Sequence, residues 1–171
     1  MKKYKMSEKR EEGFSLVELV VVVLIMAIIA VALAPQVVKW VKNSKNATDV
    51  QTKNELLRLA SIALTDKEAF SVVCNGGYTI TASKSVGSGE TTFTYTEGGG
   101  PVTVPDPTNL YWKHFLEVCA LSTFDEFESI VDIKSEPDNG AGAVTIKIEV
   151  YEDGHTNGYI TGIENDDLDI S

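Results

Sequence analysis

The stretch that decides the fold is residues 14–38, FSLVELVVVVLIMAIIAVALAPQVV. Within it, Leu19–Ala34 is an uninterrupted run of 16 apolar residues. As an α-helix, 25 residues extend for about 37 Å at ~1.5 Å per residue, against ~30 Å of hydrocarbon in a bilayer. The one charged residue in this stretch, Glu18, lowers the tendency to insert but does not outweigh the apolar side chains. The sequence therefore predicts one membrane-spanning helix.

The residues before this stretch predict its orientation. Residues 1–13, MKKYKMSEKREEG, carry five basic and three acidic side chains, and the positive-inside rule places such a segment in the cytoplasm and the rest of the chain outside. A secretory signal peptide has a similar charged start. However, the apolar run is longer than the usual ~7–15 residues, lacks a convincing A-x-A cleavage site and begins close to an acidic residue. These features favour a helix that is retained.

A motif at the start of the apolar stretch points to a known family. The residues Gly13-Phe14-Ser15-Leu16-Val17-Glu18-Leu19 resemble the prepilin processing motif of type IV pilins and pseudopilins. A small residue, an aromatic residue, an acidic residue four positions later and Pro35 at the far end of the run coincide in register. The resemblance implies that a prepilin peptidase cleaves between Gly13 and Phe14, that the new α-amine of Phe14 is methylated, and that Pro35 kinks the helix.

Glu18 is an ionisable residue beside an apolar run, and such residues usually have a function. After cleavage, the α-amine of Phe14 would be mostly protonated, since its reference pKa is near ~7.7–8.0. If many such helices pack side by side, Glu18 is buried and must be paired or protonated. An amine from a neighbouring copy would pair with it at one axial offset only. We therefore predict an assembly role for Glu18; the alternative is a polar residue at the membrane interface without a specific partner.

The remaining chain predicts an α+β fold, in which a long N-terminal helix packs on a small antiparallel sheet. Residues 39–70 continue the helix as an amphipathic half, with apolar residues at three- and four-residue steps. Residues 71–171 form a β-rich head. Its predicted elements are a hairpin of 78–85 and 90–97, a loop at 98–101, a short helix over 107–121, and a hairpin of 144–152 and 159–164.

The head is strongly acidic. Residues 68–171 hold four lysines against 18 Asp and Glu, and the whole chain has a formal net charge of −10. This charge argues against nucleic-acid binding, which needs a basic face, and is typical of a solvated surface. A calcium site is the sharper alternative, at the C-terminal acidic residues Glu164, Asp166, Asp167 and Asp169, but no EF-hand spacing is present. We therefore predict no metal and no cofactor.

Two cysteines and two histidines are the remaining chemically distinctive side chains. Cys74 and Cys119 lie in the exported part, where a disulfide between them is our prediction and buried free thiols are the alternative. His114 and His155 lie in no local motif that joins a nucleophile to a base. The sequence therefore does not predict an enzyme.

The resemblance implies a structural subunit of a type IV pilus, which acts in adhesion, twitching motility or DNA uptake. Its partners would be other copies of itself in a helical filament, the prepilin peptidase and methyltransferase, and the pilus assembly machinery. The precursor would lie in the cytoplasmic membrane and the mature protein in an extracellular pilus. Two alternatives remain: a pseudopilin of a type II secretion or competence system, and a membrane-anchored extracellular binding domain that works as a monomer.

Overall fold

The structure is a computed structural model that describes residues 14–138 and 140–163. It divides into two compact units, Met1–Trp40 and Val41–Ser171. The 48-residue helix α1, Leu16–Ala63, contributes to both units. The second unit, which we call the head, contains the C-terminal part of α1 and all the remaining elements.

In its described residues, the head joins three short helices to one five-stranded sheet. All strand pairs are antiparallel, and the strand order is β3-β2-β1-β4-β5. In chain order the elements after α1 are α2 Lys67–Val73, β1 Tyr78–Ser85, β2 Thr92–Glu97, β3 Gly100–Val102, α3 Leu110–Val118, α4 Phe124–Ile130, β4 Ala143–Val150 and β5 Thr156–Thr161. A long helix followed by an antiparallel sheet confirms the predicted α+β class.

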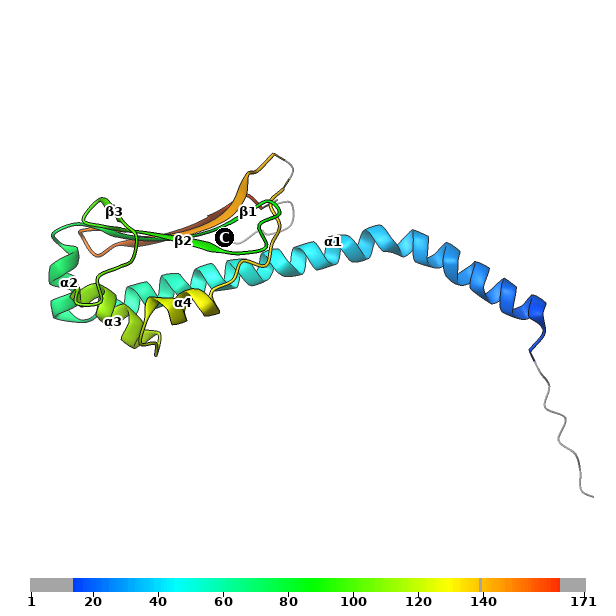
Figure 1. Ribbon diagram of the computed structural model, residues 1–171, viewed down its shortest axis with the longest axis horizontal. Coiled ribbons are helices and arrows are strands. Elements are labelled where there is room, and N and C mark those ends of the chain that lie inside the picture. Colours follow the sequence, from blue (N-terminus) through cyan, green and yellow to red (C-terminus); the bar gives the residue numbers. More distant parts are fainter. Residues whose placement is uncertain (1–13, 139, 164–171) are drawn as a thin grey trace, which may run out of the picture. The chain divides into compact units, whose positions relative to one another are not determined.

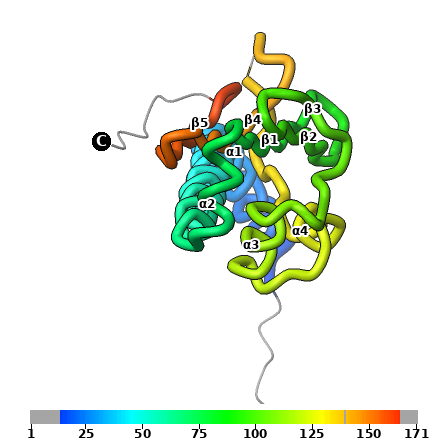
Figure 2. The backbone as a smooth tube through the Cα atoms, turned by 90° about the vertical axis from the view of Figure 1, so that its left-hand side faces the viewer, coloured from blue at the N-terminus to red at the C-terminus, as the bar shows by residue number. Residues whose placement is uncertain are grey.

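The sheet has one buried face and one half-exposed face. Along β1 and β4 the side chains alternate between buried and half-buried positions, with Ile80, Ile146 and Ile148 on the buried face. Figures 1 and 2 show that α3, α4 and the part of α1 within the head lie on the same side of the sheet. The head is therefore a two-layer structure with its core between sheet and helices.

An aromatic cluster fills the part of the core that α3 and α4 cover. Trp112 and Phe115 of α3 are fully buried, and Trp112 makes edge-on contacts with Tyr95 of β2 and Phe124 of α4, at ring-centroid distances of 5.9 and 5.6 Å. Asn109 caps α3, because its side-chain oxygen accepts a hydrogen bond from the Tyr111 amide at 3.0 Å. The α3 helix is thus held at its start by a cap and along its length by aromatic packing.

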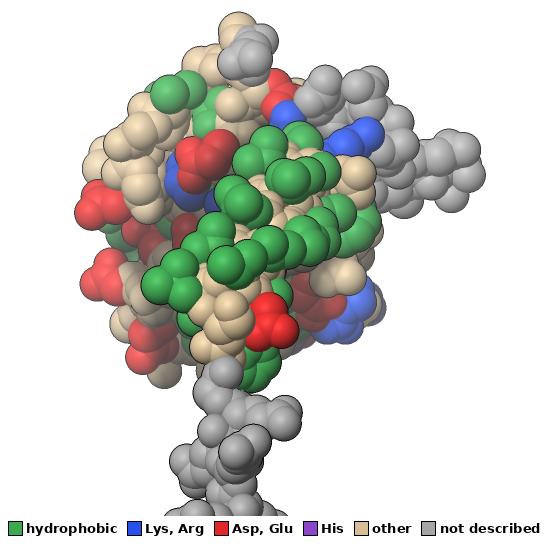
Figure 3. Space-filling model, turned by 90° about the vertical axis from the view of Figure 1, so that its right-hand side faces the viewer, with side chains coloured by type: hydrophobic (Ala, Val, Ile, Leu, Met, Phe, Trp, Pro, Cys, Tyr) green, Lys and Arg blue, Asp and Glu red, His purple; other side chains and the backbone are tan. Residues whose placement is uncertain are grey.

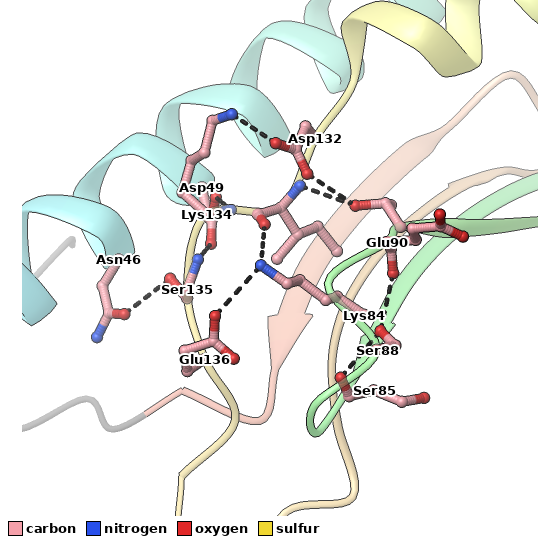
Figure 4. A network of polar contacts seen from close by, with 12 residues as sticks. Asn46, Asp49, Lys84, Ser85, Ser88, Glu90, Asp132, Lys134, Ser135 and Glu136 are labelled. Carbon is pink, nitrogen blue, oxygen red and sulfur yellow. Dashed lines mark hydrogen bonds and ion pairs between the residues drawn. The ribbon is translucent and has the colours of Figure 1, made fainter.

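Residues 131–136 form an extended segment that we call the strap. Val131, Ile133 and Ser135 are buried, whereas the three residues between and after them are exposed. On the α1 side, the carboxylate of Asp49 accepts hydrogen bonds from the amides of Lys134 and Ser135, each at 2.8 Å. Figure 4 shows these contacts together with the Ser135 hydroxyl, which donates to Asn46 Oδ1 at 2.8 Å.

On the other side, the sheet holds the strap through Lys84. This largely buried side chain of β1 donates from Nζ to the Ile133 carbonyl at 3.0 Å and pairs with Glu136 at 3.3 Å (Figure 4). Thr91 adds a further contact, since its hydroxyl accepts from the Ile133 amide at 3.1 Å. Side chains from α1 and from the sheet side therefore pair the backbone polar groups of a segment that pairs with no strand among the described residues.

Several boundaries differ from the sequence prediction. The long helix ends at Ala63 and does not continue to residue 70, because Asp66 caps the separate helix α2 by accepting hydrogen bonds from Glu68 and Ala69 amides. Strand β5 begins at Thr156, three residues earlier than predicted, because its pairing with β4 starts directly after the turn.

Two elements were missed altogether. Residues 100–102 form β3 where a loop was predicted, and Pro101 is tolerated there because β3 is an edge strand. The helix α4 was not predicted either. Its cap is Thr123, whose hydroxyl accepts from the Glu126 amide at 3.2 Å. Thr123 and Glu126 have the T-x-x-E spacing of a capping box, so the sequence contained a signal for the start of this helix.

Candidate functional site

The start of α1 is a capped helix terminus. Helix α1 begins at Leu16, and the Leu19 amide donates to the Ser15 carbonyl at 3.2 Å. The Glu18 carboxylate, through Oε2, accepts a hydrogen bond from the Ser15 amide at 3.0 Å. The first amides of a helix have no partner within it, so Glu18 pairs one of them and places a negative charge at the positive end of the helix dipole.

This capping role of Glu18 was missed in the sequence analysis. The signal was present, because Ser15 and Glu18 have the S-x-x-E spacing of a capping box directly before an apolar run. The cap does not exclude the predicted ion pair. A carboxylate has two oxygens with about four acceptor sites, and the bond to Ser15 occupies one oxygen. Glu18 can therefore cap the start of its own helix and also accept a hydrogen bond from a donor of another chain.

The surface of α1 in the first unit is almost entirely apolar. Every large apolar side chain from Phe14 to Trp40 is exposed, from 44% for Val22 to 84% for Phe14. Figure 3 shows hydrophobic side chains gathered on this part of the molecule. The most apolar 18-residue window has a mean hydropathy of 3.2 with none of it buried, which makes α1 long and apolar enough to cross a membrane. A surface of this size needs lipid or protein to cover it.

Of the predicted processing residues, the structure describes Phe14 but not Gly13, which lies outside the described residues. Pro35 lies inside α1, and the helix continues on both sides of it. A proline within a helix lacks the amide that would donate to the carbonyl four residues earlier. The cleavage, methylation and kink assigned by resemblance remain predictions.

The predicted disulfide is not formed. Cys74 and Cys119 are both free thiols; Cys74 is exposed at the C-cap of α2, and Cys119 is half-buried at the C-cap of α3. Cys119 lines a groove between α1 and α4, whereas Cys74 does not. Burial, with a smaller effect from the Glu55 charge, raises the pKa of the Cys119 thiol to about 11.

The described residues bring together no group of side chains that could hold a metal ion. Among residues 14–138 and 140–163, no three His, Cys, Asp or Glu side chains lie close enough to hold a metal ion. His114 contacts Glu117 at 3.3 Å, and the His155 ring stacks on Tyr151. The C-terminal acidic residues named as calcium candidates lie outside the described part of the chain.

Comparison with known proteins identifies the N-terminal motif. The family model described as Prokaryotic N-terminal methylation motif matches residues 9–34. No curated protein and no solved structure gives a significant match to the chain. The matched motif is that of structural pilins and not of an enzyme family. Residues 9–34 therefore carry the type IV prepilin leader signature, which marks precursors of type IV pilin-like proteins and pseudopilins.

Proposed function

We propose that this protein is a structural subunit of a type IV pilus, cleaved between Gly13 and Phe14 and methylated on the Phe14 amine. Residues 14–38 hold the precursor in the cytoplasmic membrane, and the mature subunits then polymerise through α1 into an extracellular filament. The observation that carries this proposal is the exposed apolar surface of α1, which begins at a capped turn inside the matched leader motif.

Lipid covers such a surface in the membrane, and only other protein can cover it in a filament. Side-by-side packing of α1 helices would remove the apolar side chains from water, at roughly 25 cal/mol per Å² of buried apolar surface. It would also bury Glu18, whose charge then requires a cation. The methylated amine of Phe14 in a neighbouring copy is that cation, and the pairing fixes the axial offset between subunits. The prepilin peptidase and the pilus assembly machinery are the partners required for these steps.

The first test identifies the processed terminus. Material sheared from cells is separated from membranes, and the N-terminal residue and mass of the polypeptide are determined by mass spectrometry. We expect methylated Phe14 in the sheared fraction. An intact Met1 found only in the membrane fraction would instead indicate an ordinary membrane anchor. Gly13→Leu should prevent cleavage, because the residue before the cut is then no longer small.

A pair of Glu18 variants separates the cap from the ion pair. Glu18→Gln keeps a side-chain carbonyl that accepts from the Ser15 amide but removes the charge, whereas Glu18→Ala removes both. We expect membrane insertion to persist in both variants and filament yield to fall sharply in both. Loss of filaments in the Ala variant alone would assign assembly to the cap, and normal yield from both would remove the ion-pair proposal.

A further inference from the structure

The head carries an apolar groove between α1 and α4, with a volume of about 350 Å³. The buried side chains of Leu56 and Phe127 line it, together with the half-buried Leu59 and Cys119. At its edge, Ile130 leaves 65% of its surface exposed. We call this feature the α1–α4 groove. An apolar cleft of this kind accepts apolar side chains that protrude from another element.

Polar side chains border the groove on the α1 side. Gln51 and Thr52 line it, as does Glu55, which forms an exposed ion pair with Arg58 at 2.5 Å. An apolar strip with a polar border is the surface that a helix with exposed apolar side chains recognises in a partner. While the groove is empty, these polar side chains keep its border in contact with water.

The chain itself contains a segment of matching chemistry. The run Leu19–Ala34 is apolar at every position, and all its side chains are exposed. The charges also favour contact between copies, since residues 39–67 carry six basic and three acidic side chains while residues 68–171 carry four basic and 18 acidic ones.

We propose that the α1–α4 groove receives apolar side chains from the run Leu19–Ala34 of a second copy in the assembled filament. This proposal rests on the proposed function, because the run becomes available only after it leaves the membrane. The contact would cover the exposed Ile130 and close the approach to Cys119. A second contact of this kind would fix the position of one head relative to the helix of its neighbour, in addition to the pairing of Glu18.

The two native cysteines provide the first test. Sheared filaments, membrane-bound precursor and detergent-dispersed subunits are treated with N-ethylmaleimide, and alkylation of Cys119 and Cys74 is followed separately by peptide mass spectrometry. In filaments we expect Cys119 to react at least ~10-fold more slowly than in dispersed subunits, as for a group that reacts only when a contact opens. Cys74, which does not line the groove, reports the general access of the reagent.

Each other result overturns the proposal in a recognisable way. Equal rates of Cys119 alkylation in filaments and dispersed subunits would show that the groove stays open, and the proposed function would stand without it. Protection already complete in the membrane-bound precursor would assign the groove to lipid. Absence of any filament, with Met1 intact, would overturn the proposed function as well.

A matched pair of variants tests the groove without relying on Cys119. Ile130→Lys places a charge at the groove edge, and Val86→Lys places one at a side chain with nearly the same exposure, 66% against 65%, that does not line the groove. Both residues are exposed, so both variants should fold. We expect a several-fold lower filament yield for Ile130→Lys with normal cleavage, and little change for Val86→Lys. Equal yields would contradict the proposal.

Crosslinking then identifies the occupant. In a Cys74→Ser background, single cysteines are placed in turn along Leu19–Ala34, and sheared filaments are treated with a short bismaleimide. We expect dimers linked through Cys119 from positions repeating every three or four residues, because those positions share one helix face. Protection of Cys119 without dimers from any position would show that a different segment or partner fills the groove.

Discussion

The buried carboxylate of Asp49 offers a sharp test of what holds the head together. Asp49 is fully buried and accepts hydrogen bonds from the amides of Lys134 and Ser135, each at 2.8 Å. A hydrogen bond to a charged group contributes about 1.5–3 kcal/mol. Removing both, and leaving two buried amides unpaired, should therefore cost about 3–6 kcal/mol. Because small domains are stable by about 5–15 kcal/mol, Asp49→Ala should weaken the head severely.

The assay is urea unfolding of the full chain in detergent micelles, followed by the near-ultraviolet circular dichroism of the buried aromatic cluster around Trp112. Asp49→Asn retains one acceptor oxygen and should lose about half as much stability as Asp49→Ala. Asn54→Ala, an exposed site on the same helix, is the control. If Asp49→Ala unfolds within about 1 kcal/mol of Asn54→Ala, the strap is not held by these charge-assisted bonds and the reasoning is wrong.

Two further predictions concern the thiols and a glycine. In dispersed subunits at pH 8, Cys119 should be alkylated more slowly than the exposed Cys74, because burial raises the pKa of its thiol to about 11. Burying the neutral thiol contributes stability that is present below the thiol pKa of the unfolded chain, near 9, and that is lost as the pH rises to about 11. Equal alkylation rates of the two thiols across pH 7–10 would contradict the burial of Cys119. Gly162→Ala should destabilise by more than ~1 kcal/mol, because its φ is +87° and a Cβ would overlap the Ala143 carbonyl oxygen. Gly142→Ala, where a Cβ meets no atom of the described residues within 4 Å, should unfold like the wild type in the same urea titration.

The N-terminal segment, up to residue 38, was predictable from sequence because the signals that define it are local. An uninterrupted apolar run predicts a helix in lipid whatever the rest of the chain does, and the matched leader motif, residues 9–34, includes this run. The S-x-x-E cap at Ser15 and Glu18 was equally local and could have been predicted. The two hairpins, β1–β2 and β4–β5, were located from alternation and turn residues, although their ends shifted by up to three positions. The β1–β4 and β2–β3 pairs were not predicted.

The polar and apolar contacts within the head could be identified only from the tertiary structure. Asp49 lies within an amphipathic helix, and only folding brings it to the strap, 85 residues away. The α1–α4 groove likewise combines Leu56 and Ile130 from different helices. Cys119 lies in that groove while Cys74 is exposed outside it, and both thiols are free. Sequence alone therefore determined the membrane helix and its leader, because insertion into lipid depends on the apolar composition of one local segment. Contacts between distant residues are decided by packing, which no local pattern encodes.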